Sequence, residues 1–352
     1  MFTKLASRRP PTAGLLDMLL GPHGVDRYTE LVDQLWTSAS RATVVAVERP
    51  TPRSVTLRLH PNRPIATRAG QHLTVTVEID GRRHNRCYSP AGREGDRDIE
   101  LTVTRHEGGT VSEYLYRDAR PGMVVDLSEP AGDFVLPHPH PGRLMFIAGG
   151  SGITPVMSML RTLAAQRHEG EIAVLYYIRG LQDACYREEL ESMPGVRALF
   201  VCTRGRGGEA VAGLTGHFTD EHLSASMIDP DAVYVCGPPS LVDAVRRHRP
   251  DALAESFAPR SFVIPTSAGG GRVTFADSGV VVDDDGRPLL EQAEAAGLSP
   301  VNGCRMGICH TCTRRKTRGA VRNLTTGAVC AADDEDIQIC VSAPLGDVEI
   351  AL

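Results

Sequence analysis

The chain has 352 residues, a formal net charge of −5 and a pI near 6.2. This length suits two or three domains, each large enough to bury a core of its own. The acidic balance, and the lack of a basic stripe interleaved with aromatic residues, argue against nucleic acid and anionic membranes as direct partners.

The N-terminal segment, the lengths of the apolar stretches and the cysteines bear on the protein's location in the cell. No stretch approaches the roughly 18 apolar residues of a membrane-spanning helix, so no direct membrane insertion is expected. Two prolines interrupt the short apolar run near the N-terminus, and we expect residues 1–38 to form a surface extension and not a signal peptide. A group of the nine cysteines lies in the last fifty residues, which is typical of a metal site in a reducing compartment. The predicted location is the cytoplasm, and the predicted state is a monomer.

Residues 41–58 and 73–79 alternate apolar and polar side chains, with Pro and Gly between them. This is the period of half-buried antiparallel strands. The pattern continues to about residue 136 with one short helical stretch, VSEYLYRDA. It predicts a small antiparallel β-barrel.

From residue 143 the pattern changes. The apolar runs RLMFIAG, IAVLYYI, VRALFVCT and AVYVCG alternate with the helical stretches PVMSMLRTLAAQR and SLVDAVRRHR. Alternation of buried strands and helices predicts an α/β domain with a doubly wound parallel sheet. A Pro-, Gly- and Ser-rich segment then reads as a linker, before a hairpin with an acidic Asp-Gly turn, a helix and the cysteines. The predicted units are an extension (1–38), a barrel (39–138), an α/β domain (139–257), a linker (258–271) and a C-terminal domain (272–352).

The cysteines of the C-terminal domain carry the most specific motif. Cys304, Cys309 and Cys312 have the spacing C-x4-C-x2-C, and Cys340 follows after 27 intervening residues. This is the spacing of plant-type 2Fe-2S ferredoxins. Neighbouring glycines, Gly303 and Gly307, let the backbone fold closely around such a cluster.

Two alternatives bear on the cysteine motif. A structural zinc site fits Cys309 and Cys312 alone, but zinc sites usually pair two such knuckles and a second is absent from the sequence. Cys330 competes with Cys340 as the fourth ligand. Its surroundings resemble a polar turn, whereas Cys340 lies in the strand-like IQICVSAP, so Cys340 is preferred. The motif GCRMGICHTC with the downstream ICV resembles the plant-type ferredoxin family over residues 272–352, which implies an α+β, β-grasp domain.

A possible flavin site begins with Arg86, Cys87, Tyr88 and Ser89, which follow a strand. An Arg can bind a pyrophosphate, a Tyr can stack on a flavin ring and a Ser hydroxyl can bond to the ring. Alone, the four residues fit an ordinary strand with an exposed Arg better than a flavin site. Downstream, glycines precede Ser112 at a helix start, where free N–H groups can bind phosphate. Together the motifs resemble the ferredoxin-NADP reductase family, whose flavin domain uses R-x-Y-S and a later G-x-x-S to hold FAD. The resemblance also implies cofactor contacts at Val103, Gly109 and Val111.

A possible nicotinamide site begins with the loop GGSGITP after a predicted strand. Gly149, Gly150 and Gly152 allow close phosphate approach, and Thr154 is expected to cap the next helix. Pro155 takes the position of the third glycine of G-x-G-x-x-G, so the dinucleotide fingerprint is not met. A buried Cys at a strand end usually serves packing. However, GGSGITP followed by Cys236, Gly237 and Pro238 resembles the nicotinamide domain of the same reductases, and extends the resemblance over residues 39–258.

The choice of coenzyme depends on two arginines. The second strand of the α/β domain ends at Arg179 and the third at Arg204. Arg suits the 2′-phosphate of NADPH, and Arg204 resembles the phosphate-binding Arg of NADP-dependent members. Both arginines also fit a solvated surface. NADPH is therefore predicted, with NADH as the alternative.

The order of the modules predicts an oxidoreductase in which NAD(P)H reduces FAD and a 2Fe-2S cluster passes single electrons to a partner. Ser89, Thr154 and Cys236 are expected to shape the flavin–nicotinamide contact, and Arg86 and Ser112 to bind the FAD pyrophosphate. The layout resembles actinobacterial reductases that serve acyl-CoA desaturases, which makes a desaturase, soluble or membrane-bound, the predicted partner. It also resembles reductases of Rieske dioxygenases and haem-thiolate monooxygenases. A redox sensor without turnover is an alternative of a different class.

Overall fold

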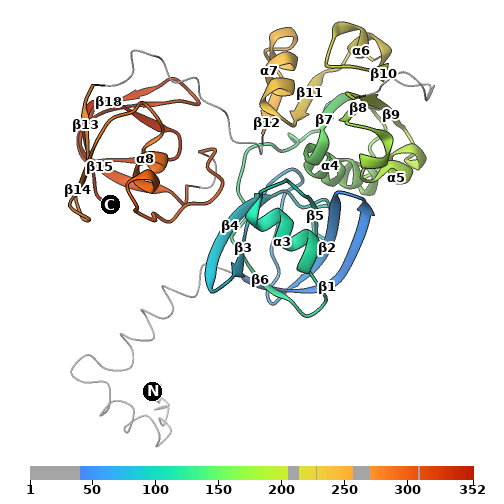
Figure 1. The fold of residues 1–352 in the computed structure, drawn as a ribbon. Coiled ribbons are helices and arrows are strands. Elements are labelled where there is room, and N and C mark those ends of the chain that lie inside the picture. Colours follow the sequence, from blue (N-terminus) through green and yellow to red (C-terminus); the bar gives the residue numbers. More distant parts are fainter. Residues whose placement is uncertain (1–39, 205–213, 227, 257–269, 308–309) are drawn as a thin grey trace, which may run out of the picture.

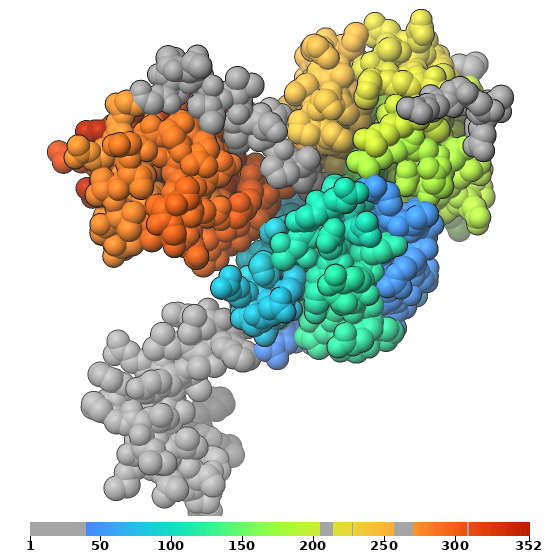
Figure 2. Space-filling model, viewed as in Figure 1, coloured from blue at the N-terminus to red at the C-terminus, as the bar shows by residue number. Residues whose placement is uncertain are grey.

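The computed structural model describes residues 40–204, 214–226, 228–256, 270–307 and 310–352. Three six-stranded sheets follow one another along the chain, and Figure 1 shows them as three lobes. Separate clusters of buried apolar side chains lie in the first and third lobes, which Figure 2 shows in blue to green and in orange to red. In the described parts of the chain, no helix is both long and apolar enough to span a membrane.

The first lobe is an antiparallel sheet whose strand order brings its two edges together. The order is β4 (Arg82–Tyr88), β3 (Leu73–Ile79), β6 (Val124–Leu127), β1 (Ser40–Thr51), β2 (Ser54–Pro61) and β5 (Ile99–Thr104). Just beyond β4, the Ala91 N–H donates to the Glu100 carbonyl of β5 over 2.8 Å. The helix α3 (Thr110–Asp118) packs at this end of the sheet through Val111 and Leu115. The predicted antiparallel barrel is confirmed.

The second lobe is a parallel sheet, as predicted. Its order is β10 (Leu214–Thr215), β9 (Val196–Cys202), β8 (Glu171–Ile178), β7 (Arg143–Gly149), β11 (Ala232–Cys236) and β12 (Leu253–Glu255). The connecting helices are α4 (Ile153–Ala165), α5 (Arg187–Ser192), α6 (Asp220–Ala225) and α7 (Pro239–His248). The strand order reverses between β7 and β11, and such a switch point opens a ligand crevice at the carboxyl ends of the strands.

The third lobe is a mixed sheet with one helix. Its order is β14 (Val280–Asp283), β13 (Arg272–Phe275), β18 (Ser342–Ile350), β15 (Thr313–Asn323) and β16 (Val329–Cys330), with β17 (Glu335–Gln338) also paired to β15. The β13–β18 pair is parallel, and α8 (Leu289–Ala295) buries Leu289 and Leu290 against the sheet. This is the predicted α+β arrangement.

One turn of this lobe differs from the prediction. The hairpin β13–β14 turns at residues 276–279, where Gly279 has a φ of +66°. The acidic Asp-Gly segment lies after β14 instead, where the Asp284 carboxylate accepts a 2.9 Å bond from the Gly286 N–H. A short Asp side chain can hold a turn in this way without forming a hairpin.

Candidate functional site

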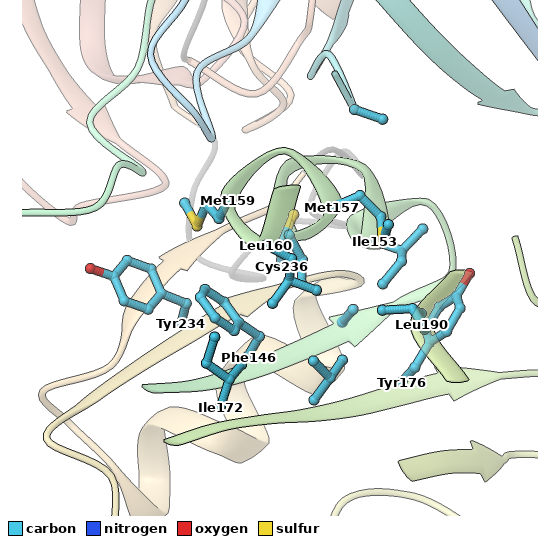
Figure 3. Close-up of a cluster of buried hydrophobic side chains, with 14 of the residues drawn as sticks. Phe146, Ile153, Met157, Met159, Leu160, Ile172, Tyr176, Leu190, Tyr234 and Cys236 are labelled. Atoms are coloured by element: carbon cyan, nitrogen blue, oxygen red, sulfur yellow. The ribbon is translucent and has the colours of Figure 1, made fainter. Parts of the chain in front are cut away.

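The first two lobes share one apolar core. Figure 3 shows its part around α4, where Met159 lies on the side of Tyr234 and Met157 lies beside Ile153. Four buried side chains from the first lobe belong to the same cluster: Ala69, Ala91, Phe134 and Leu136. The barrel and the parallel sheet are therefore held against each other by apolar packing.

The motif predicted to bind the flavin lies at the end of β4. Arg86 is half-buried, and its Nη1 donates to the Asn85 carbonyl over 2.7 Å. Burial raises the pKa of Tyr88, so this side chain stays a neutral phenol. Ser89 is 2% exposed, and its hydroxyl has no hydrogen-bond partner among the described residues. A buried hydroxyl rarely lacks a partner, so the site fits a bound ligand that supplies one.

The second flavin motif forms the start of α3. Gly109 is the N-cap, and no described side chain caps the first turn. The Ser112 hydroxyl accepts from the His106 N–H at 3.2 Å, and a Cβ at Gly109 would lie 2.6 Å from this hydroxyl. Uncapped N–H groups at a helix start fit a phosphate.

Three other predicted contacts have buried side chains. Val103 and Val111 are each 1% exposed within the barrel core, and Cys87 is 7% exposed, with its sulfur 3.7 Å from the Thr74 hydroxyl. Protein packing already accounts for these side chains. A cofactor contact at these positions therefore falls to the backbone.

The two predicted nicotinamide motifs meet at the switch point. Gly149 ends β7 and Gly150 and Gly152 follow it, while Gly237 and Pro238 follow β11. A Cβ on Gly152 would lie 2.0 Å from the Cys236 carbonyl oxygen, and one on Gly149 would lie 2.7 Å from Pro238 Cδ. The two loops therefore touch through their backbones, and glycine is required where they do.

Thr154 does not cap α4 as predicted. The N-cap is Gly152, and the Thr154 hydroxyl instead donates to the Ser151 carbonyl over 3.1 Å. The 3-10 turn at Gly150–Gly152 starts the helix earlier than the sequence pattern indicated. Thr154 is buried behind the loop, at 4% exposure.

Cys236 lies beside Glu255, a contact that the sequence did not predict. Its thiol is fully buried at the end of β11, and Glu255 of β12 is its register partner. Burial, and then the Glu255 carboxylate, raise the pKa of Cys236 well above its usual range, so the thiol stays neutral. Glu255 is itself buried, which raises its pKa, and its carboxylate bonds to His72 Nδ1 of the barrel over 3.2 Å.

The arginines predicted to select the coenzyme lie side by side beyond β8 and β9. The Arg204 N–H donates to the Arg179 carbonyl over 3.2 Å, and both residues are exposed. Burial and the nearby charges of Arg179 and Arg53 lower the pKa of His106. Positive charge thus gathers at the carboxyl edge of the sheet, which suits an anionic ligand.

Three of the four predicted cluster ligands are buried in the third lobe. Cys304, Cys312 and Cys340 are 6%, 2% and 4% exposed, while Cys309 lies outside the described residues. A hydrogen bond with the Cys312 side chain, which favours the protonated Cys340 thiol, raises the pKa of Cys340 together with burial, so these two side chains lie close together. The Met306 N–H donates to Cys304 Sγ over 3.3 Å, as backbone amides do around cluster sulfurs.

The described residues contain no three His, Cys, Asp or Glu side chains that converge on a single point, as one metal ion would require. A 2Fe-2S cluster spreads its thiolates over two irons and does not require such convergence. The cluster loop is also braced from outside. The Gln338 amide donates to the Gly307 carbonyl over 2.7 Å, and Arg305 binds both oxygens of Glu294 in α8. The three described thiols therefore fit such a cluster.

The structural contexts of Cys330 and Cys340 are the reverse of the predicted ones. Cys330 lies in β16, paired with Val321, and its sulfur is 3.7 Å from a Glu335 carboxylate oxygen. Cys340 lies in the turn between β17 and β18. A turn suits a ligand better than a paired strand because its sulfur can face the loop that carries Cys304 and Cys312.

Comparison with known proteins agrees with this division into three parts. The chain matches an oxidoreductase FAD-binding domain over residues 48–136, an oxidoreductase NAD-binding domain over 146–247 and a 2Fe-2S iron-sulfur cluster binding domain over 273–345. It is 33% identical over 340 residues to an NADPH oxidoreductase of Mycobacterium tuberculosis, a match that covers 92% of this chain and 87% of that protein. The chain belongs to the ferredoxin-NADP reductase family with a C-terminal 2Fe-2S domain. This reductase is an oxidoreductase built to bind FAD, a nicotinamide coenzyme and an iron-sulfur cluster.

Two further relatives show how far the likeness extends. The reductase is 29% identical over 316 residues to the reductase component of a glycine betaine monooxygenase of Pseudomonas aeruginosa, covering 80% of this chain and 86% of that protein. Its fold matches that of phthalate dioxygenase reductase with a TM-score of 0.61 at 23% identity, covering 90% of this chain and 98% of that chain. The three-part architecture is thus common to both proteins.

Proposed function

We propose that this reductase passes electrons from NADPH through FAD and a 2Fe-2S cluster, one at a time, to an oxygenase or desaturase. The observation that carries the proposal is that one chain contains a flavin site, a nicotinamide crevice and a loop of buried cysteines. FAD, when bound, accepts a hydride and can release its electrons singly. A redox sensor without catalytic turnover does not require a flavin site, a nicotinamide site and a cluster site in one chain.

The chain's own residues position the cofactors in this proposal. Arg86 and the start of α3 at Ser112 bind the FAD pyrophosphate, and the buried Ser89 hydroxyl bonds to the flavin ring. Cys236 and Thr154 form the wall behind the nicotinamide. The Glu255–His72 pair lies next to this wall, and its side chains are only 9% and 3% exposed.

An acyl-CoA desaturase is our first candidate for the partner. The match to the Mycobacterium tuberculosis relative covers 92% of this chain, which is more than residues 39–352 make up, so its similarity extends into residues 1–38. The layout in which the segment GVDRYTELVDQLWTSASRA precedes the barrel resembles actinobacterial reductases that serve acyl-CoA desaturases, and this segment lies mostly within the extension.

An oxygenase is the second candidate, and the relatives' names favour it at least as strongly. They include the reductase of a glycine betaine monooxygenase, a component of the 1,2-phenylacetyl-CoA epoxidase of Escherichia coli, and a component of the methane monooxygenase of Methylosinus trichosporium. These names describe parts of larger oxygenase systems. We further propose that the chain works as a cytoplasmic monomer; all its described cysteines are free thiols, which suits a reducing compartment.

The purified protein tests the proposal directly. We expect flavin absorption bands together with about two irons per chain, and NADPH oxidation with ferricyanide as acceptor. Adding a purified desaturase or an oxygenase component, each with its substrate, then identifies the partner by product formation. Stoichiometric zinc without iron or sulfide would overturn the cluster, and absence of turnover with ferricyanide would favour a sensor.

Arg204 gives a separate test of the coenzyme. Replacing Arg204 with Ala is expected to raise the KM for NADPH by about tenfold or more, because a charge-assisted bond to the 2′-phosphate contributes roughly 1.5–3 kcal/mol. NADH lacks this phosphate, so its KM should change little. Steady-state kinetics with both coenzymes measure the difference, and equal effects on the two would show that Arg204 is a bystander.

A further inference from the structure

One face of α4 carries polar side chains that all bond to a single segment of the barrel. Ser158 donates its hydroxyl to the Gly92 carbonyl over 2.6 Å, and the Thr162 hydroxyl accepts from the Glu94 N–H at 3.0 Å. Arg161 lies between them and donates from Nη1 to the Ala91 carbonyl over 2.9 Å. Residues three or four apart share a helix face, so these three side chains form one stripe along α4.

Arg161 makes the strongest of these connections. The same Nη1 donates to Glu100 of β5 over 2.8 Å, while Nε and Nη2 each donate to Glu189 of α5 over 2.7 Å. The guanidinium carbon also lies 5.1 Å from the centre of the Tyr186 ring. The Arg161 side chain is 21% exposed, so its bonds are largely shielded from solvent. A planar, bidentate Arg fixes both distance and orientation, which a surface ion pair does not.

The two segments that Arg161 joins, residues 91–94 and the helix α4, are both close in sequence to the proposed hydride-transfer site. Residues 91–94 begin two positions after Ser89, and the Ala91 N–H forms the bond that joins β4's extension to β5. The helix α4 begins directly after the loop Gly149–Gly152 and includes Thr154 on its first turn. A shift of α4 along this segment would therefore move the nicotinamide loop relative to the flavin motif.

We propose that Arg161 is a positioning residue for hydride transfer, which sets the distance between nicotinamide and flavin by fastening α4 to residues 91–94. The inference rests on the proposed flavin and nicotinamide sites. Arg161 lies well along α4, so it acts through the placement of the two sites and not by touching the reacting atoms. A misplacement of about 1 Å can slow a reaction about 100-fold. Binding of the coenzyme's adenosine end depends on other strands and should be unaffected.

The test is anaerobic stopped-flow reduction of the flavin by NADPH in the full-length Arg161→Lys variant. Lysine keeps the charge but cannot bond to Ala91, Glu100 and Glu189 together. We expect the first-order rate of flavin bleaching to fall by about 10- to 100-fold, with the dissociation constant for NADPH changed less than about twofold. We also expect a weaker flavin–nicotinamide charge-transfer band. FAD content and the rate of reduction by dithionite should match the wild type.

The matched control is Arg143→Lys, because Arg143 makes a comparable pair with Asp231, at 2.7 Å, within the parallel-sheet lobe alone. It should reduce its flavin at the wild-type rate. If Arg161→Lys does not fold, the Ser158→Ala/Thr162→Val double variant decides, since it removes two of the bonds without leaving a charge unpaired; slower bleaching is expected there as well. The inference is overturned if the folded Arg161→Lys variant bleaches its flavin at the wild-type rate. If that variant does not fold, a wild-type rate in the double variant overturns it. Failure of the wild type itself to bleach with NADPH would overturn the proposed function instead.

Discussion

Replacing Cys304 with Ser is expected to stop electron flow beyond the flavin while leaving flavin reduction intact. The cluster loses a ligand, so iron content and cytochrome c reduction should fall by at least about tenfold. The barrel and the parallel sheet have cores that do not include the third lobe, so they should stay folded and keep FAD. Ferricyanide can take electrons from reduced flavin, so NADPH–ferricyanide activity should remain near the wild-type value. Iron analysis and the two assays on one preparation measure the effect.

Cys330 provides the control for this experiment. Its thiol contacts Glu335, while the contact to Cys340 comes from Cys312. Cys330→Ser should therefore keep both iron and cytochrome c reduction. A loss of iron in Cys330→Ser, with iron retained in Cys340→Ser, would show that the fourth ligand was chosen wrongly, although the reductase assignment would stand.

Local patterns of the sequence were sufficient to predict the folds of the first two domains, whereas the fold of the third was predicted from the resemblance of its cysteine motif to plant-type ferredoxins. Alternation with period two predicted β3 at Leu73–Ile79, and a continuous apolar run predicted β7 at Arg143–Gly149. These signals succeed because burial on one or both faces of a sheet acts on each strand separately. The spacing of the cysteines is equally local, since three of them lie within nine residues of one loop.

Contacts between domains were not predictable in the same way. His72 and Glu255 bond across 183 positions of the chain, and Glu255 lies in a strand of three residues that has no periodic signal. In the sequence, Arg161 is one of the chain's many arginines, and nothing in its predicted helix marks it as a contact to the barrel. The prediction of a polar turn at Cys330 was wrong for a related reason. The strand β16 has two residues, and it is defined by its pairing with β15 rather than by its own side chains. Such residues are found only when separate segments are brought together.

Gly152→Ala is expected to break the electron path at its start, before the flavin. The added Cβ would lie 2.0 Å from the Cys236 carbonyl oxygen and 2.4 Å from its carbon, so the two loops of the nicotinamide crevice must move apart. The neighbouring atoms are backbone, and overpacking of this kind costs about 1–3 kcal/mol. The displacement should lower NADPH–ferricyanide activity by about 100-fold, whereas FAD, iron and reduction by dithionite should stay at wild-type levels.

The control for this prediction lies at the opposite end of the same strand. A Cβ on Gly142, directly before β7, would meet only the Asp231 carboxylate oxygen at 3.6 Å among the described residues, which is ordinary contact. Gly142→Ala should therefore keep full activity. Together with Cys304→Ser, the pair separates two halves of one path, because ferricyanide reduction is lost in Gly152→Ala and kept in Cys304→Ser. If Gly152→Ala oxidises NADPH as fast as Gly142→Ala, the two loops do not form the nicotinamide site, and the coenzyme must bind elsewhere on the parallel sheet.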